Sequence, residues 1–394
     1  MMLGLLLARA GVAVIVLEKH KDFFRDFRGD TVHPSTLQLL DELGLIERFL
    51  ALRHTVVRKL EILTADGPVT VANFSHLRTK YPYVALVPQW DLLNLLAQEA
   101  KCTVSFTLLM EAEATRLEER AGAVTGMYYR VGDEERLVRA NLVVAADGRH
   151  SVLRDGARLP RVENSPPMDV LWFSLPRLPS DSENVSLRVG VGKMVVLINR
   201  FDYWQVGYIV PKGRAQEMLV SGVDEITKGL AEVAPELGDR VNELKSADQV
   251  KLLTVQSNRL LKWWLPGFLC IGDAAHAMTP VGGVGINLAI QDAVAAANQL
   301  WLPLRDGKLK DADLQAIQRR RTFPTVVAQA LQAAVQKRLL VHVFSSAAQI
   351  KLPLLFRLLL SLPVLRDLPA RAIGLGVRPE YPSAALAAAM KASR

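Results

Sequence analysis

The sequence predicts an α/β fold with a β-rich second region and a helical C-terminal part. Three stretches carry this prediction. Near the start, a helical pattern is followed by a continuous apolar run over residues 12–17, which is typical of a strand in a parallel sheet. Residues 170–210 contain apolar runs separated by turn residues, which indicates antiparallel strands. Residues 269–300 combine a short apolar run, a glycine-rich loop and a long alanine-rich helix.

Size and composition restrict the class of protein. The chain has 394 residues, 50% of them hydrophobic, so it can bury a large core. Its net charge of +8 is spread along the chain, and we expect no nucleic-acid partner. Cys102 and Cys270 lack partners at metal-ligand spacing, so we expect no metal site and a reducing, cytoplasmic location. No run reaches the ~18 apolar residues of an integral membrane span.

The first elements come from residues 2–18. Residues 2–10 place leucines on one helical face, with Gly4 and Ala8 one turn apart, where a helix packs closely on a sheet. The apolar run 12–17 predicts a parallel strand covered on both faces, and Glu18 stands at its end. This order is the second half of a Rossmann βαβ unit, in which the acid binds ribose hydroxyls. The first strand and G-x-G-x-x-G loop of that unit do not appear, and we expect a wrongly assigned start codon or a truncated chain.

The stretch from residue 269 to residue 300 is the centre of the predicted site. A short strand leads to Gly272 and Asp273, whose carboxylate can accept hydrogen bonds from sugar-type hydroxyls. The loop that follows carries one proline and three glycines, namely Pro280, Gly282, Gly283 and Gly285. Glycines let a backbone approach a ligand closely, and the first turn of a helix presents unpaired N–H groups with a partial positive charge. Such a site is suited to an anion or an electron-rich ring.

This stretch resembles the second FAD-contacting motif of the flavoprotein aromatic hydroxylases, the para-hydroxybenzoate hydroxylase family. The resemblance implies a Rossmann-like FAD-binding domain of the GR2 type, in which Asp273 binds the ribityl chain of the flavin. It also implies that the glycine-rich helix start faces the pyrimidine end of the isoalloxazine. The cofactor site then includes Gly272, Asp273, Pro280, Gly282, Gly283, Val284, Gly285, Ile286 and Asn287.

Two further regions carry the same resemblance. A strand ending in Asp147-Gly148, followed by Ser151 and Arg154, is similar to the Asp-Gly motif of these hydroxylases, which contacts FAD. Gly148 allows a tight turn, Ser151 can cap a helix, and Arg154 can pair with Asp147 or with a phosphate. Family members also carry an Arg before the second helix and a Gln or Arg at a later helix entry. Arg28 and Gln89 match these positions, so the resemblance places both beside the cofactor.

The middle and the end of the chain are predicted from local pattern alone. We expect Asp202 at a turn between two strands of a sheet that covers the substrate pocket. Five aromatic residues of this sheet either line the pocket or fill the core: Trp172, Phe173, Phe201, Tyr203 and Trp204. We interpret Arg319–Arg321 as a solvated helix face and expect a kink or a break at Pro324. Residues 351–374 form a docked amphipathic tail, a subunit contact or a membrane-surface helix.

The resemblance covers most of the chain and implies a discontinuous domain order. The FAD-binding domain takes residues 1–55, 88–160 and 256–300, the β-rich substrate domain takes residues 56–87 and 161–255, and residues 301–394 form the helical C-terminal region. The implied function is an FAD-dependent monooxygenase. NAD(P)H reduces FAD, dioxygen adds to give a flavin C4a-hydroperoxide, and one oxygen atom is delivered to an aromatic or quinol-like small molecule.

Several points stay open at this level. No residue stands out as a catalytic base, and the chain is expected to be a monomer or a homodimer. The same fold also supports a flavin dehydrogenase, a reductase or a halogenase. A non-catalytic remnant that does not bind FAD is an alternative from a different class, because the first glycine loop is missing from the sequence.

Overall fold

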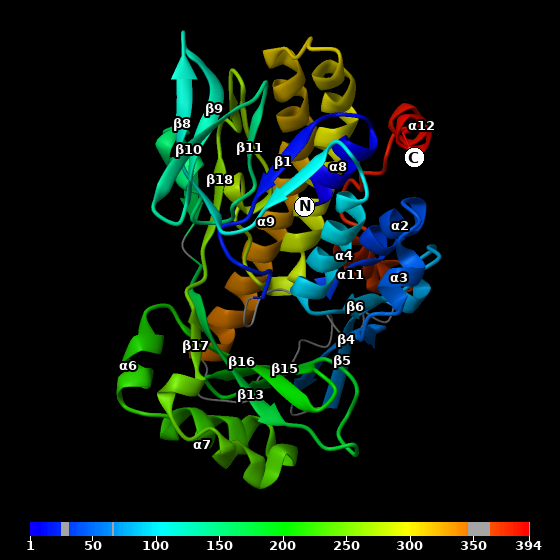
Figure 1. Cartoon of the computed structure of the whole chain (residues 1–394). Helices are drawn as coiled ribbons and strands as arrows, with labels where there is room; N and C mark the ends of the chain where they lie inside the picture. Colours follow the sequence, from blue (N-terminus) through cyan, green and yellow to red (C-terminus); the bar gives the residue numbers. More distant parts are fainter. Residues whose placement is uncertain (25–30, 65–66, 165, 346–362, 394) are drawn as a thin grey trace.

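The computed structural model describes residues 1–394 with the exception of 25–30, 65–66, 165, 346–362 and 394. Two long helices run through the middle of the molecule, with sheets on either side of them (Figure 1). The described α-helices are α1 (Met2–Arg9), α2 (Pro34–Glu42), α3 (Ile46–Leu50), α4 (Gln89–Lys101), α5 (Val152–Gly156), α6 (Arg214–Val220), α7 (Asp224–Val233), α8 (Gly285–Arg305), α9 (Asp311–Ser345), α11 (Pro363–Gly374) and α12 (Ala384–Ala392).

The parallel strands predicted for the first region are present in two separate sheets. β1 (Val14–Leu17) pairs in parallel with β7 (Phe106–Leu109). β11 (Val143–Ala145) pairs in parallel with β20 (Phe268–Cys270), which also pairs with β19 (Trp264–Leu265). Helix α1 packs closely on β1, because a Cβ atom built on Gly4 would lie 2.9 Å from Val16 Cγ2. The predicted α/β class and the tight helix–strand packing are confirmed.

The prediction that residues 12–17 form a strand covered on both faces was wrong. The strand β1 is half-buried at best, and the side chain of Ile15 is 48% exposed. Among the described residues β1 pairs with β7 alone, and its residues line a cavity. The apolar run is left partly uncovered because α1 packs on the face of Val14 and Val16, whereas Ile15 points to the other face and borders the cavity. That a first strand and a glycine loop are missing stays a prediction.

A seven-stranded, mainly antiparallel sheet forms the second region, with strand order β17-β13-β16-β15-β14-β4-β5. Its strands are β4 (Lys59–Thr64), β5 (Gly67–Asn73), β13 (Met168–Pro176), β14 (Ser186–Gly190), β15 (Lys193–Asn199), β16 (Tyr203–Pro211) and β17 (Lys251–Leu253). Helices α6 and α7 cover one face of the sheet through a shared apolar core, and the other face is turned toward α9 (Figure 1). The predicted turn at Asp202 between β15 and β16 is confirmed.

Smaller sheets complete the described strands. β2 (Thr31–Val32) and β3 (Thr55–Val57) flank β6 (Val84–Leu86). The other strands are β8 (Ala112–Arg120), β9 (Ala123–Val131), β10 (Glu134–Arg139), β12 (Arg161–Asn164) and β18 (Ser257–Leu260). The division of the chain into the six domain segments stays a prediction.

The helical C-terminal part begins after α8, and α9 lies beside α8 in the centre of the molecule (Figure 1). Helix α9 is continuous through Pro324, so of the predicted kink or break the break does not occur. Packing of α9 against α8, β15 and β19 outweighs the one backbone hydrogen bond that proline removes. Of the predicted tail, residues 351–362 lie outside the described residues, and α11 packs on β5. No described helix is long and apolar enough to cross a membrane.

Candidate functional site

A cavity of about 2940 Å³ lies between the parallel strands, the start of α8 and the face of the seven-stranded sheet that is turned toward α9. It brings together most of the residues that the sequence predicted for the site. These are Glu18, Gln89, Asp147, Gly148, Gly272, Asp273, Pro280, Gly282, Gly283, Gly285 and Ile286. Val284 and Asn287 do not belong to the lining, and Arg28 lies outside the described residues. Stretches far apart in the sequence therefore meet at one cavity.

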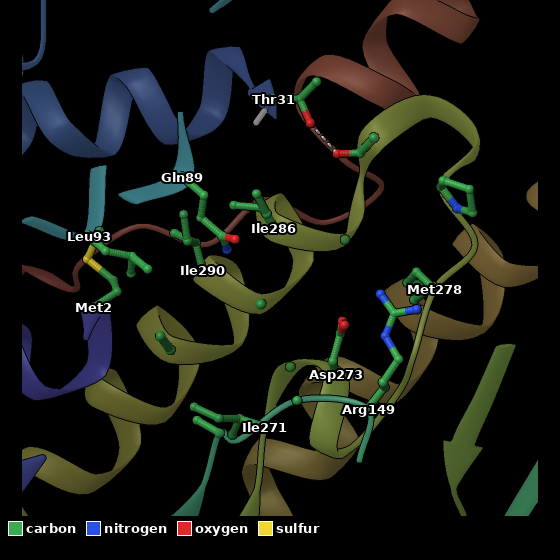
Figure 2. A pocket seen from close by; sticks show the side chains of 18 of the residues that line it. Met2, Thr31, Gln89, Leu93, Arg149, Ile271, Asp273, Met278, Ile286 and Ile290 are labelled. Atoms are coloured by element: carbon green, nitrogen blue, oxygen red, sulfur yellow. Dashed lines mark hydrogen bonds between the residues drawn. The ribbon is translucent and has the colours of Figure 1, made fainter. Parts of the chain in front are cut away.

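The Gly272–Asp273 turn follows β20 directly. Gly272 has a positive φ of 60°, and a Cβ atom at this position would lie 3.0 Å from the Ala289 Cβ atom on α8. Only glycine allows this close approach between the turn and the helix without a shift of the backbone. The approach directs the Asp273 carboxylate into the cavity, where Figure 2 shows it opposite the first turns of α8. Asp273 is thus placed where it can accept hydrogen bonds from a ligand.

A buried cluster of charges holds this turn from behind. Asp292 of α8 accepts hydrogen bonds from the Gly272 backbone N–H (3.0 Å), from His276 Nε2 (2.5 Å) and from Arg321 Nε (2.8 Å). Burial is the largest influence on its carboxyl and disfavours the charge. Attraction and hydrogen bonding from His276 and Arg321 together outweigh that influence, so the pKa of Asp292 lies below its ordinary value. Three donors therefore hold the ionised carboxylate of Asp292, and this carboxylate fixes the turn through the Gly272 N–H.

The interpretation of Arg319–Arg321 as a solvated helix face was wrong for Arg321, whose side chain is 0% exposed. Besides Asp292, it donates to the Arg378 backbone oxygen (3.2 Å) and contacts Glu380. Arg320 forms two hydrogen bonds to Glu380, at 2.6 and 3.1 Å. The basic run thus ties the segment that follows α11 to the back of the predicted site. The signal that sequence reasoning missed is the acid Asp292 on the neighbouring helix.

The glycine-rich loop before α8 is held by two residues from the β2 region. Gly283 has a positive φ of 62°, and its carbonyl oxygen accepts a hydrogen bond from Thr31 Oγ1 (2.8 Å), which Figure 2 shows. The same oxygen accepts from His33 Nε2 (3.0 Å). Burial lowers the pKa of His33 to about 4, so the ring is neutral at pH 7 and carries its proton on Nε2. The sequence prediction of the site assigned a role to neither residue.

Helix α8 begins at Gly285, and no side chain at Val284 caps it. The N–H groups of its first turn therefore lie at a cavity wall with the positive end of the helix dipole. The side chain of Asn287 takes no part in this. It is buried and accepts hydrogen bonds from Ser35 Oγ (2.8 Å) and Thr36 Oγ1 (2.9 Å) of α2. At this predicted position the side-chain oxygen is therefore engaged within the protein, and binding of the cofactor by Asn287 stays a prediction.

Glu18 and Gln89 lie on other walls of the cavity. Gln89 is the first residue of α4, and Figure 2 shows its side chain next to Ile286 in the first turn of α8. Glu18 follows the last residue of β1, and its carboxylate accepts a hydrogen bond from the His20 backbone N–H (3.0 Å). Both residues line the cavity, and their predicted contact with the cofactor stays a prediction.

The Asp147–Gly148 turn reaches the cavity from β11. Gly148 has a positive φ of 89°, and Ser151 caps α5 by accepting from the Arg154 backbone N–H (3.1 Å), as predicted. The guanidinium of Arg154 does not pair with Asp147. It binds Asp155 (3.0 Å) and the backbone oxygens of Arg149 (3.0 Å) and Ala274 (3.5 Å), and so joins the two motif turns.

Two residues of the cavity lining go beyond the predicted site: one was not predicted, and the other decides between pocket and core for an aromatic residue of the sheet. The sequence prediction did not include Arg149, whose guanidinium extends into the cavity beside Asp273 in Figure 2. Its position directly after Gly148 was the available signal. Of the five aromatic residues of the sheet, Trp172 lines the cavity, whereas Phe173 and Trp204 are buried in the core.

The site geometry agrees with sequence comparison. A family profile described as an FAD binding domain matches residues 1–334. The chain belongs to the family of FAD-dependent aromatic monooxygenases. It is therefore an FAD-dependent oxidoreductase with NAD(P)H as the reductant typical of this family. The resemblance drawn from the Gly272 stretch is confirmed.

Three similar proteins show the extent of the match. The chain is 33% identical over 343 residues to a 6-methylpretetramide 4-monooxygenase from Streptomyces rimosus, covering 86% of this chain and 81% of the relative. It is 23% identical to a para-nitrophenol 4-monooxygenase from a Pseudomonas strain, covering 81% and 80%. The solved structure of an anhydrotetracycline hydroxylase from Streptomyces rimosus matches with a TM-score of 0.75 at 24% identity, over 97% of this chain and 75% of that one.

The residues present fit the flavin and ribityl portions of FAD. The glycines of the Gly283 loop and the Gly272 turn let the backbone approach a flat ring closely. The uncapped start of α8 offers N–H groups to the electron-rich edge of that ring, and Asp273 offers a carboxylate to its polyol chain. The site can therefore hold a flavin and can favour negative charge on it.

Proposed function

We propose that the chain hydroxylates a large, fused-ring aromatic molecule with FAD, NAD(P)H and dioxygen. The observation that carries the substrate class is the size of the cavity. Pockets for drug-sized ligands measure about 300–1,000 Å³, and the cavity of about 2940 Å³ exceeds that range. It has room for a flavin and for a second large molecule between α8 and the seven-stranded sheet. The names of the relatives, which include 6-methylpretetramide and anhydrotetracycline, support the same class.

The overall reaction balances as follows. Substrate, dioxygen, NAD(P)H and one proton give hydroxylated substrate, water and NAD(P)⁺. Reduction by the nicotinamide and activation of dioxygen are the chemistry that FAD supplies when bound. The protein has to bind both molecules, orient them and exclude water from the reacting atoms.

The residues of this chain divide that work. The Gly272–Asp273 turn and the Gly283 loop hold the cofactor side, and the first N–H groups of α8 stabilise negative charge there. The sheet face with Val170, Met194 and Ile209 is apolar and lines the opposite wall, where it excludes water. We assign no catalytic base, because the position of none of the described titratable side chains at this wall distinguishes it as a base.

The proposal is tested in two steps on the purified chain. The first step adds FAD and measures protein-bound flavin absorption after gel filtration, beside a version extended upstream by a glycine-loop segment. The second step measures NAD(P)H oxidation with a panel of fused-ring phenols under isotopically labelled dioxygen, with mass spectrometry of the products.

A substrate that accelerates NAD(P)H oxidation and acquires one labelled oxygen atom supports the proposal. Unlabelled, dehydrogenated or halogenated product would replace it with one of the other flavin chemistries. If neither version binds flavin, the chain is not an enzyme of this type. Flavin binding with hydrogen peroxide as the only oxygen product for every phenol also overturns the proposal.

A further inference from the structure

Asp292 is a buried acid of α8 to which the proposed reaction assigns no task. Its side chain is 0% exposed and does not belong to the cavity lining, so it cannot contact a ligand itself. Its Oδ2 atom accepts hydrogen bonds from the Gly272 N–H (3.0 Å) and from His276 Nε2 (2.5 Å). Its Oδ1 atom accepts from Arg321 Nε (2.8 Å). A buried carboxylate is therefore bonded to the turn that forms part of the cavity wall.

Gly272 is held through both of its backbone groups. Its N–H donates to Asp292, and its carbonyl oxygen accepts from the backbone N–H groups of Ala275 (2.9 Å) and His276 (2.8 Å). Of these three contacts, the one to Asp292 comes from a distant side chain. Because Asp273 is the next residue, the conformation of Gly272 sets the direction in which the Asp273 carboxylate enters the cavity (Figure 2). That direction therefore depends on the acceptor that Asp292 provides.

Arg321 anchors Asp292 to a later part of the chain. Its Nη1 atom donates to the Arg378 backbone oxygen (3.2 Å) and lies 3.5 Å from the Glu380 carboxylate. Glu380 is also held by Arg320, through two hydrogen bonds. The acceptor of the Gly272 N–H is thus fixed by contacts that extend to the segment after α11.

The chemistry of these partners requires a carboxylate at this position. A backbone N–H and a guanidinium can only donate, so each of them needs an acceptor oxygen. Burial disfavours the charge of Asp292, but His276 and Arg321 outweigh burial and hold its pKa below the ordinary value, so both oxygens accept. An asparagine has the same size and a single acceptor oxygen. In Asp292→Asn this oxygen should face the charged Arg321, and the amide N–H groups should then point at the Gly272 N–H.

We propose that Asp292 is a positioning residue for the cofactor, which directs the Asp273 carboxylate to the polyol chain of the flavin. Asp292 touches neither the cofactor nor the substrate and acts through Gly272. This inference rests on the flavin contact of Asp273 in the proposed function and adds the buried residue on which that contact depends. Loss of Asp292 should therefore weaken the binding of flavins that carry the polyol and spare the binding of the bare ring.

The test compares two flavin probes, riboflavin and lumiflavin. They share the isoalloxazine ring, and lumiflavin carries a methyl group where riboflavin carries the polyol chain. Dissociation constants for the full chain are measured from the quenching of flavin fluorescence. We expect the wild-type chain to bind riboflavin about tenfold more tightly, as hydrogen bonds to a charged carboxylate give.

The variants should change this preference in a defined way. Asp273→Ala should remove it, and Asp292→Asn should bring it close to the value of Asp273→Ala. The affinity for lumiflavin should change little in either variant. In the double variant the second substitution should add no further loss of preference, because both act on the same contact.

The matched control is Asp169→Asn, the same substitution on a second buried acid, which lies on β13 outside the cavity lining. Asp169 also accepts from a glycine backbone N–H, that of Gly213 (3.1 Å), from the Val255 N–H (3.0 Å) and from Lys212 Nζ (2.8 Å). Its substitution should lower Tm as Asp292→Asn does, yet it should keep the tenfold preference. The control thereby separates positioning of the cofactor from a general loss of stability.

A second pair of variants serves if Asp292→Asn does not fold. Arg321→Gln removes the cation that keeps the buried Asp292 carboxyl ionised and should lower the preference for riboflavin. Arg321→Lys keeps a cation at this position and should retain the preference. Equal preference in these two variants would contradict the positioning role.

Three other results also overturn the inference. These are equal loss of affinity for both probes in Asp292→Asn, an unchanged preference in that variant, and no preference in the wild-type chain. Product formation by the wild-type chain decides the proposed function separately. An Asp292-dependent preference without hydroxylated product supports the positioning role and rejects the monooxygenase. Hydroxylation without any preference for riboflavin supports the monooxygenase and rejects the positioning role.

Discussion

Two buried polar regions along α8 and α9 differ in how completely their hydrogen bonds are made. Behind the Gly272 turn, Asp292 is surrounded by a backbone N–H, His276 and Arg321. At the α9 end of the cavity, Gln336 Nε2 and Thr279 Oγ1 are as deeply buried, yet both lack a partner among the described residues, whereas in the first region only Nδ1 of His276 does. Burial alone therefore does not tell whether the protein satisfies a polar group. The difference is whether the protein itself satisfies the group.

This comparison assigns different work to the two regions. A satisfied cluster fixes backbone that must keep one shape, here the turn that presents Asp273. An unsatisfied buried group lowers stability, and natural sequences keep such groups mostly where function requires them. Substitutions that break hydrogen bonds in the first region should accordingly lower stability, and removal of an unpartnered atom in the second should cost little.

The largest effect is expected from breaking the satisfied cluster. Asp292→Ala removes the closer of the two carboxylates that pair with the buried Arg321 and leaves only Glu380 at 3.5 Å, and breaking such a buried pair costs about 3–5 kcal/mol. The free energy of unfolding from urea titration measures this. Asp306→Ala provides the control, since its pair with Arg305 is exposed and contributes about 0–1 kcal/mol. Equal losses from the two substitutions would show that the Asp292 cluster contributes no more stability than an exposed ion pair.

The second prediction concerns pH and His33. Its pKa of about 4 lies below the ordinary value of 6.5, so on acidification the unfolded chain takes up the proton first. The free energy of unfolding should then be highest above pH 6.5 and should fall toward pH 4, by about 3 kcal/mol over the whole window.

The variant His33→Gln isolates this effect. Glutamine keeps a donor for the Gly283 carbonyl but does not titrate, so the pH dependence attributable to His33 should disappear. The measurement is unfolding by urea at several pH values between 4 and 7 for both proteins. Parallel curves for the wild type and the variant would contradict the buried, neutral histidine.

The third prediction tests the glycine loop. Gly283→Ala places a Cβ atom 2.6 Å from Thr31 Oγ1 at a positive φ, which should cost about 1–3 kcal/mol and weaken flavin binding. Gly285→Ala is the matched control, because its nearest contact is 3.9 Å away and the residue begins a helix. It should leave stability unchanged or raise it by about 0.5–1 kcal/mol. Flavin absorption after gel filtration and Tm report the two effects.

The parts of this site that the sequence could predict are those fixed by neighbours in the chain. The Gly272–Asp273 turn, the Ser151 cap and the start of α8 depend on residue types within a few positions of one another, and the structure has them as expected. The same holds for the paired strands around Asp202.

The parts that it could not predict depend on distant partners. Arg321 lies in a run of three arginines that is typical of a solvated surface, and only the position of Asp292 on α8 explains its burial. The glutamines of α9 look like ordinary polar helix residues until the loop carbonyls are placed beside them. In the same way, the exposure of Ile15 follows from which face of β1 the helix α1 covers and not from the apolar pattern of the strand.

The smallest effects separate two neighbouring glutamines and bear most directly on the comparison. Gln332→Leu leaves the carbonyls of Thr279 and Val281 without their donor, which should cost about 1–3 kcal/mol of stability. Gln336→Leu removes a donor that the protein does not satisfy and should change the free energy of unfolding by less than about 1 kcal/mol, or raise it. Urea unfolding of both variants gives the two values. Because the substitution, the helix and the depth of burial are the same, a similar loss in both would show that Gln336 is structurally bonded, and opposite signs would show that the protein leaves its amide nitrogen unsatisfied.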